Sequence, residues 1–146
     1  TLLGQRPASH ELCVDLGSSP GGWTWVLAQC GGEVISVDKA PLAANIAAMP
    51  SVRSVRSSAF ALAPEALGPV DWLCCDVACY PDRLLKMIRR WLGAGNCRNF
   101  ICTVKLQGEP DHGTLSALAA IPGARLVHLS HNRHELTWIK LALENK

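Results

Sequence analysis

Two charged side chains stand at the ends of apolar runs in the sequence. Asp76 ends the run 70–76, and Lys105 lies near the end of the run 99–106. A lysine at the end of an apolar strand is costly unless it is paired or used. Burial lowers the pKa of a lysine and carboxylates raise it, so Lys105 could act as a neutral base or as an ammonium ion that stabilises an anion. A structural ion pair is the third interpretation.

A glycine-rich turn follows the first apolar run, in the segment 15–23 (DLGSSPGGW). Gly17 permits a tight turn, and Gly21 and Gly22 let a ligand approach the backbone closely. Asp38 ends the next apolar run 21 residues after Gly17. A carboxylate in that place can accept hydrogen bonds from both hydroxyls of a ribose. The alternative is a plain glycine turn with a capping aspartate.

The turn departs from two common nucleotide-binding patterns. Ser19 occupies the second glycine position of the dinucleotide fingerprint, and Pro20 precedes the glycine pair. The Gly-Lys-Ser/Thr ending of a phosphate-binding loop is absent. S-adenosylmethionine suits the turn better, because it has a ribose but no phosphate.

These residues require a scaffold that brings strand ends together. Apolar runs and helix-length segments alternate, which predicts a single α/β domain over residues 1–146. We expect a Rossmann-like, doubly wound, mainly parallel sheet with an antiparallel edge strand, because no helix separates the last two strands. Ligands of such sheets lie beyond the carboxyl ends of the strands. The expected strands are 11–16, 33–38, 51–56, 70–76, 99–106, 125–129 and 136–143, and the expected helices are 20–30, 42–49, 81–92 and 114–121.

The segment 15–23, with its Pro-Gly-Gly-Trp, resembles the first motif of the FtsJ-type ribose 2'-O-methyltransferases. The spacing beyond it is similar to the RlmM-like branch, which modifies a cytidine of large-subunit ribosomal RNA, and the similarity covers 11–143. The resemblance implies a class I methyltransferase fold, S-adenosylmethionine as cofactor and an RNA substrate. Trp23 would pack on the methionine part of the cofactor or in the core. The expected cofactor-binding residues are Gly17, Ser19, Pro20, Gly21, Gly22, Trp23, Asp38, Ser58 and Asp76.

The family is known for a catalytic Lys-Asp-Lys-Glu tetrad, and the resemblance carries three of its members to Asp76, Lys105 and Glu135. The first lysine should precede the glycine turn, yet no lysine precedes Lys39. We therefore expect the chain to be a fragment that lacks a leading helix and an N-terminal RNA-binding region. Arg133 and His134 stand beside Glu135 and are the expected RNA contacts.

The composition excludes several other classes of protein. Hydrophobic residues make up 49% of the 146 residues, which excludes disorder, and no apolar run is long enough to span a membrane. Seven cysteines without a Cys-x-x-Cys pair indicate reduced thiols and a cytoplasmic location. His128, His131 and His134 are spaced by three, but they fall on a strand and a loop rather than on one helical face, and the cysteines fall on other strands, so no metal is expected. The net charge of +2 is low for a domain that grips RNA alone.

Two functions from different classes remain open. One is an RNA ribose 2'-O-methyltransferase. The other is a non-catalytic module that binds S-adenosylmethionine or RNA and scaffolds a partner. Both need the glycine turn and Asp38, but only the enzyme needs Lys105. An NAD-linked reductase is disfavoured by Ser19 and Pro20.

The third strand's end yields a first prediction. The family usually places an aspartate there, near the adenine amine, whereas this chain has Ser58. We expect Ser58→Asp to raise the affinity for S-adenosylmethionine in isothermal titration, because a carboxylate accepts a hydrogen bond more strongly than a hydroxyl does. An unchanged or lower affinity would count against this assignment of Ser58.

Overall fold

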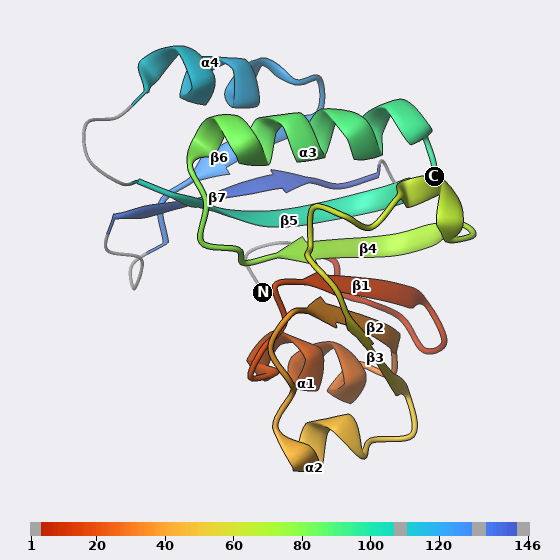
Figure 1. The fold of residues 1–146 in the computed structure, drawn as a ribbon. Helices are drawn as coiled ribbons and strands as arrows, with labels where there is room; N and C mark the ends of the chain where they lie inside the picture. The colour runs from red at the N-terminus through yellow and green to blue at the C-terminus, as the bar shows by residue number, and fades with distance from the viewer. Residues whose placement is uncertain (1–3, 107–110, 130–133, 143–146) are drawn as a thin grey trace.

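A computed structural model describes residues 4–106, 111–129 and 134–142 of the chain. Its seven strands form one sheet in the order β3-β2-β1-β4-β5-β7-β6 (Figure 1). The strands are β1 (Leu12–Leu16), β2 (Glu33–Asp38), β3 (Val52–Arg56), β4 (Val70–Cys75), β5 (Cys97–Lys105), β6 (Ala124–Val127) and β7 (Glu135–Lys140). The helices are α1 (Gly22–Gln29), α2 (Ala44–Ala47), η1 (Pro64–Ala66), α3 (Pro81–Ala94) and α4 (His112–Ala120).

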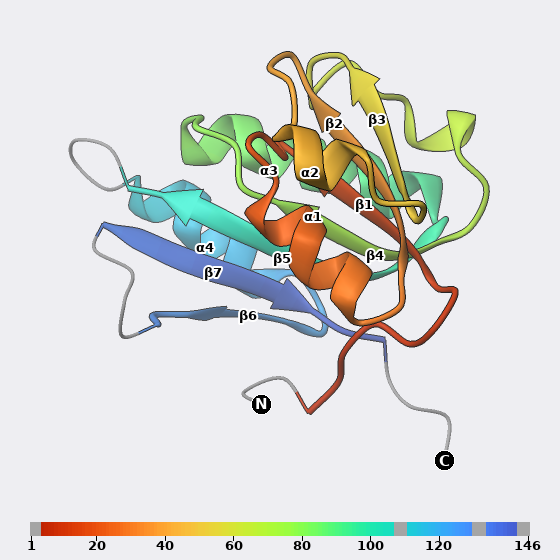
Figure 2. The same cartoon turned by 90° about the horizontal axis from the view of Figure 1, so that it is seen from below.

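Helices cover both faces of the sheet. Figures 1 and 2 show α1 and α2 on one face and α3 and α4 on the other. From β1 the chain moves outward to β2 and β3, and it later returns to β4 on the other side of β1 and moves on to β5. Right-handed crossovers in these opposite directions place the helices on opposite faces. The prediction of a doubly wound, mainly parallel sheet is confirmed.

The antiparallel part of the sheet differs in detail from the expectation. The strand that runs against the others is β7, and it lies between β5 and β6 rather than at the edge. The edge strand is β6, which pairs antiparallel with β7. This insertion places the start of β7 beside the end of β5, with Glu135 directly opposite Lys105.

The core explains the apolar runs of the sequence. The largest group of buried residues lies between the sheet and α3 and α4, and it includes Trp91, Phe100 and Trp138. The Trp138 indole donates a hydrogen bond to the carbonyl of Leu118 in α4 at 2.9 Å, which satisfies its buried N–H. All seven cysteines are free, and five of them are buried. No helix within the described ranges is long and apolar enough to cross a membrane.

The bounds of all four predicted helices shift by one or more residues, and α1 and α2 differ in ways that bear on the site. α1 starts at Gly22 with Gly21 as its N-cap, so Pro20 lies before the helix and not in its first turn. The rule that favours proline in a first helical turn is outweighed here by the glycine turn, whose Gly21 has a φ of 127°. α2 has four residues, and the rest of the expected helix 42–49 lies outside it.

Gly17 is required by a close crossing of two segments. Its φ of 75° is a conformation that favours glycine. A Cβ atom there would lie 2.6 Å from Cγ2 of Val77 and 2.9 Å from the carbonyl oxygen of Asp76. The turn after β1 therefore lies directly against the segment that follows β4.

We predict that Gly17→Ala destabilises the protein by more than about 1–2 kcal/mol, the cost of a left-handed residue alone, because the methyl group also clashes with backbone. Urea unfolding measures the change. Gly22→Ala is the matched control, since a Cβ at Gly22 meets nothing within 4 Å and alanine favours a helix. Equal stability of the two variants would contradict the assigned crossing.

Candidate functional site

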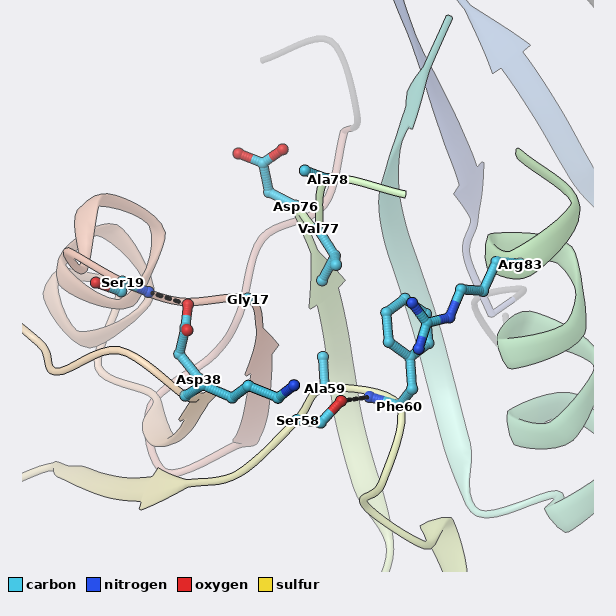
Figure 3. Close-up of a pocket in the computed structure, with 11 residues that line it drawn as sticks. Gly17, Ser19, Asp38, Ser58, Ala59, Phe60, Asp76, Val77, Ala78 and Arg83 are labelled. Carbon is cyan, nitrogen blue, oxygen red and sulfur yellow. Dashed lines mark hydrogen bonds between the residues drawn. The ribbon is translucent and has the colours of Figure 1, made fainter. Parts of the chain in front are cut away.

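A cavity of about 350 Å³ opens at the carboxyl ends of the central strands. Its walls come from the turn after β1, the end of β2, the loop after β3, the segment after β4 and the first turn of α3 (Figure 3). This is the rim that a doubly wound sheet offers to ligands. The lining residues are Gly17, Ser19, Asp38, Lys39, Ser58, Ala59, Phe60, Asp76, Val77, Ala78 and Arg83.

The glycine turn and the end of β2 are joined at Asp38. The backbone N–H of Ser19 donates to Asp38 Oδ2 at 2.9 Å, and the N–H of Ala40 donates to Oδ1 at 2.9 Å. These two bonds fix the carboxylate at the cavity wall, and Figure 3 shows the one from Ser19. A carboxylate has about four acceptor positions, so Asp38 keeps capacity for the hydroxyls of a ribose.

The remaining turn residues lie beside the cavity and not in its lining. A Cβ at Gly21 would lie 2.8 Å from Cδ1 of Ile46, so packing against α2 already explains this glycine. Trp23 packs with Leu27 and Trp72 on the α1 face of the sheet and lines a separate apolar hollow there. The structure thus places Trp23 in a packing position, whereas Gly17, Ser19, Asp38, Ser58 and Asp76 share the cavity.

Lys105 joins two carboxylates from neighbouring strands. Its Nζ donates to Glu135 Oε1 at 2.7 Å and forms an ion pair with Asp76 Oδ1 at 2.8 Å. The Lys105 side chain is 23% exposed, so this ion pair is better shielded from water than an ordinary surface pair. Asp76 also lines the cavity, and it therefore connects the charged cluster with the cavity wall.

The pKa of Lys105 is raised above its ordinary value. Desolvation lowers the pKa, but the hydrogen bonds and charges of Asp76 and Glu135 together raise it by more. The lysine is therefore an ammonium ion at neutral pH in this arrangement.

Asp15 lies beneath the glycine turn in a buried polar network. The hydroxyl of Thr24 lies 2.7 Å from Asp15 Oδ2 and 2.6 Å from the hydroxyl of Ser36, which ties α1 to β1 and β2. Asp15 is 1% exposed, and its Oδ1 has no hydrogen-bond partner among the described residues. Desolvation raises the pKa of Asp15 to about 7, against a lowering by the Thr24 hydrogen bond.

The expected RNA contacts have different outcomes. Arg133 lies outside the described residues. His134 immediately precedes β7 with a φ of 58°, and its carbonyl accepts a hydrogen bond from the N–H of Leu106 at 2.8 Å. It therefore lies at the same end of the sheet as Lys105 and Glu135.

Sequence reasoning overlooked part of the cavity wall. Arg83 lines the cavity, although the sequence places it in a basic stripe of α3, formed by Arg83, Lys86, Arg89 and Arg90, that is typical of a solvated helix face. Its place in the first turn after the Asp76 segment was the available signal, since helix starts in this fold border the ligand rim. Lys39, Val77 and Ala78 were also not assigned from the sequence, whereas the strand-end rule already places the segment 57–60, with Ala59 and Phe60, at the rim.

Comparison with known proteins agrees with this geometry. Residues 4–120 match the FtsJ-like methyltransferase family. The chain belongs to this family. It is 35% identical over 152 residues to the ribosomal RNA large subunit methyltransferase M of Aromatoleum aromaticum, with 94% of this chain and 41% of the relative covered. It is 40% identical over 137 residues to the protein of that name from Azoarcus sp. (strain BH72), with 85% and 36% covered.

The chain thus spans about two fifths of the length of the curated relatives it matches. Among solved structures, the fibrillarin pre-rRNA processing protein of Methanococcus jannaschii superposes with a TM-score of 0.62 at 16% identity, over 92% of this chain and 67% of that one. A likeness at that identity shows the shared fold, and this fold is that of the class I methyltransferases.

Asp15 provides a test of the buried network by pH. Its folded-state pKa of about 7 lies above the ordinary 3.8, so the folded protein holds a proton that the unfolded chain has released in this range. The contribution of Asp15 to the free energy of unfolding is largest below about pH 4, and it falls as the pH rises to about 7. We expect Asp15→Asn to gain stability relative to the wild type from pH 4 to 7 in urea unfolding. A difference that does not change with pH would contradict the raised pKa.

Proposed function

We propose that this chain carries the cofactor site and catalytic groups of an S-adenosylmethionine-dependent methyltransferase that acts on a ribose 2'-hydroxyl of RNA. The observation that carries the proposal is the double position of Asp76, which lines the cavity and pairs with Lys105. A cofactor bound in the cavity would then lie close to a ribose hydroxyl placed at Lys105. Membership in the FtsJ-like family supports the same conclusion.

The cavity suits an adenosine cofactor without phosphates. Asp38 has acceptor capacity for a ribose, and a Cβ at Gly22 would meet nothing within 4 Å, so the start of α1 is open to a ligand.

We propose that Lys105 acts as a cation in the reaction. S-adenosylmethionine, when bound, supplies a methyl group on a positively charged sulfur. Lys105 stabilises the negative charge that develops on the ribose oxygen as its proton leaves to water. Asp76 and Glu135 hold the ammonium group in place and maintain its charge. Positioning and charge stabilisation together are sufficient for this reaction, because no covalent intermediate with the enzyme is needed.

The substrate that fits best is large-subunit ribosomal RNA. The support is that relatives at 35% and 40% identity are named as methyltransferases of that RNA. His134 and Arg133 are proposed as RNA contacts, because they stand next to Glu135 in the sequence. A cytoplasmic location fits an RNA substrate and free cysteines.

The catalytic assignment is tested at Lys105. We expect Lys105→Met, which keeps an unbranched side chain but removes the charge, to lower single-turnover methyl transfer to large-subunit RNA by about 100- to 1,000-fold. Affinity for S-adenosylmethionine should change by less than about twofold, because Lys105 is not among the residues that line the cavity. Asp76→Asn and Glu135→Gln should each give an intermediate loss.

Lys86→Met is the matched control for this test, because Lys86 is an exposed lysine of α3 on the other side of the cavity wall. Activity of Lys105→Met equal to that of Lys86→Met would refute the catalytic role. It would favour the non-catalytic module, which needs the cavity but not the lysine.

A further inference from the structure

Phe60 separates the cavity from a second hollow. It lines the cavity together with Ser58, and it also lines a hollow of about 210 Å³ against α3. The other residues of this hollow are Arg83, Lys86, Met87 and Arg90, and Arg83 reaches the cavity as well. Phe60 and Arg83 therefore border both hollows, whereas Arg90 borders only the second one.

Both arginines contact Phe60 and hold it in different ways. The Arg83 guanidinium lies over the ring, with Cζ 3.8 Å from its centroid (Figure 3). Arg90 Nη1 donates to the Phe60 carbonyl at 2.9 Å. The Phe60 N–H donates in turn to the Ser58 hydroxyl at 3.2 Å. The ring, the carbonyl and the N–H of one residue are thus all fixed.

The chemistry of this end of the cavity differs from that of the other walls. Asp38 and Asp76 supply carboxylates to the walls at β2 and β4, whereas the loop after β3 supplies a hydroxyl and an aromatic ring. The Ser58 hydroxyl accepts a hydrogen bond from the Phe60 N–H and carries no charge, so it can offer a base only a weak, neutral hydrogen bond. A planar neutral base would therefore be recognised here chiefly by stacking, for which a ring and a guanidinium plane are suited.

We propose that Arg83 and Arg90 are positioning residues that hold Phe60 as the wall against which the adenine of the cofactor stacks. This inference rests on the proposed S-adenosylmethionine site and adds the residues that determine affinity for its adenosine half. The basic stripe of α3 is then divided in function. Arg83 and Arg90 hold Phe60, whereas the Lys86 and Arg89 side chains are exposed and make no hydrogen bond or ion pair with another described residue.

The test uses isothermal titration of the chain with two ligands. One is S-adenosylmethionine, and the other is 5'-methylthioadenosine, which keeps the adenosine and lacks the amino-acid tail. We expect Arg83→Ala to weaken both ligands by the same factor of about 3- to 10-fold, as expected for loss of a cation–π contact. Arg90→Ala should weaken both by about threefold. The matched controls Lys86→Ala and Arg89→Ala should stay within about twofold of the wild type.

A double-mutant cycle shows whether Arg83 acts through Phe60. In a Phe60→Leu background, Arg83→Ala should add less than about twofold, because the ring it positions is gone. Arg83→Lys keeps a cation and should lie between the wild type and Arg83→Ala, which also guards against a variant that fails to fold. Thermal unfolding of each variant checks the fold.

The outcomes separate this inference from the proposed function. A wild type that binds neither ligand overturns both. A wild type that binds both, with Arg83→Ala equal to Arg89→Ala, overturns only the role of the arginines. Weaker binding of S-adenosylmethionine with unchanged 5'-methylthioadenosine also overturns it, because Arg83 would then act on the amino-acid half.

Discussion

The ion cluster of Lys105 with Asp76 and Glu135 is the interaction on which the site depends. Lys105 ends β5, Asp76 follows β4 and Glu135 begins β7. The lysine Nζ lies 2.8 Å from Asp76 Oδ1 and 2.7 Å from Glu135 Oε1, so these strand ends must all lie at one rim. Lys105 faces Glu135 directly in the register of β5 and β7. If β7 ran parallel to β5, its first residue would lie at the opposite end of the strands, far from Lys105. The antiparallel direction of β7 therefore places Glu135 beside Lys105.

The cavity depends on a second constraint, the close crossing of the glycine turn and the segment after β4. Gly17 has no side chain, and the Asp76 segment therefore passes directly over the turn. The N–H of Asp76 donates to the Leu16 carbonyl at 3.1 Å, which joins the two segments. The carboxylate that lines the cavity and the lysine that pairs with it are held by the same crossing. The proposed cofactor cavity and the proposed catalytic lysine therefore lie side by side at one rim of the sheet.

Much of this arrangement was predictable because it is local or follows a general rule. Asp38 and Lys105 end apolar runs, and the ends of parallel strands in this fold meet at one rim. Glu135 came from family resemblance, and the structure places it opposite Lys105. The position of β7 was not predictable from periodicity, because the pattern of apolar residues gives a strand but not its neighbours. Arg83 was overlooked because its partner Phe60 comes from a segment 23 residues away in the chain.

The start of α1 shows the limit of local rules. Proline is favoured in a first helical turn, yet the helix begins two residues after Pro20, because Gly21 takes a backbone conformation that ends the turn. Trp23 then falls on the face that packs against Trp72 rather than on the cavity wall.

The most direct measurement is a crystal structure of the chain with S-adenosylhomocysteine, the product form of the cofactor. The account predicts density in the cavity, with the ribose at Asp38, the adenine against Ser58 and Phe60, and the sulfur directed toward Asp76 and Lys105. Ligand bound in the apolar hollow at Trp23, or oriented with the adenine at Asp76, would contradict it.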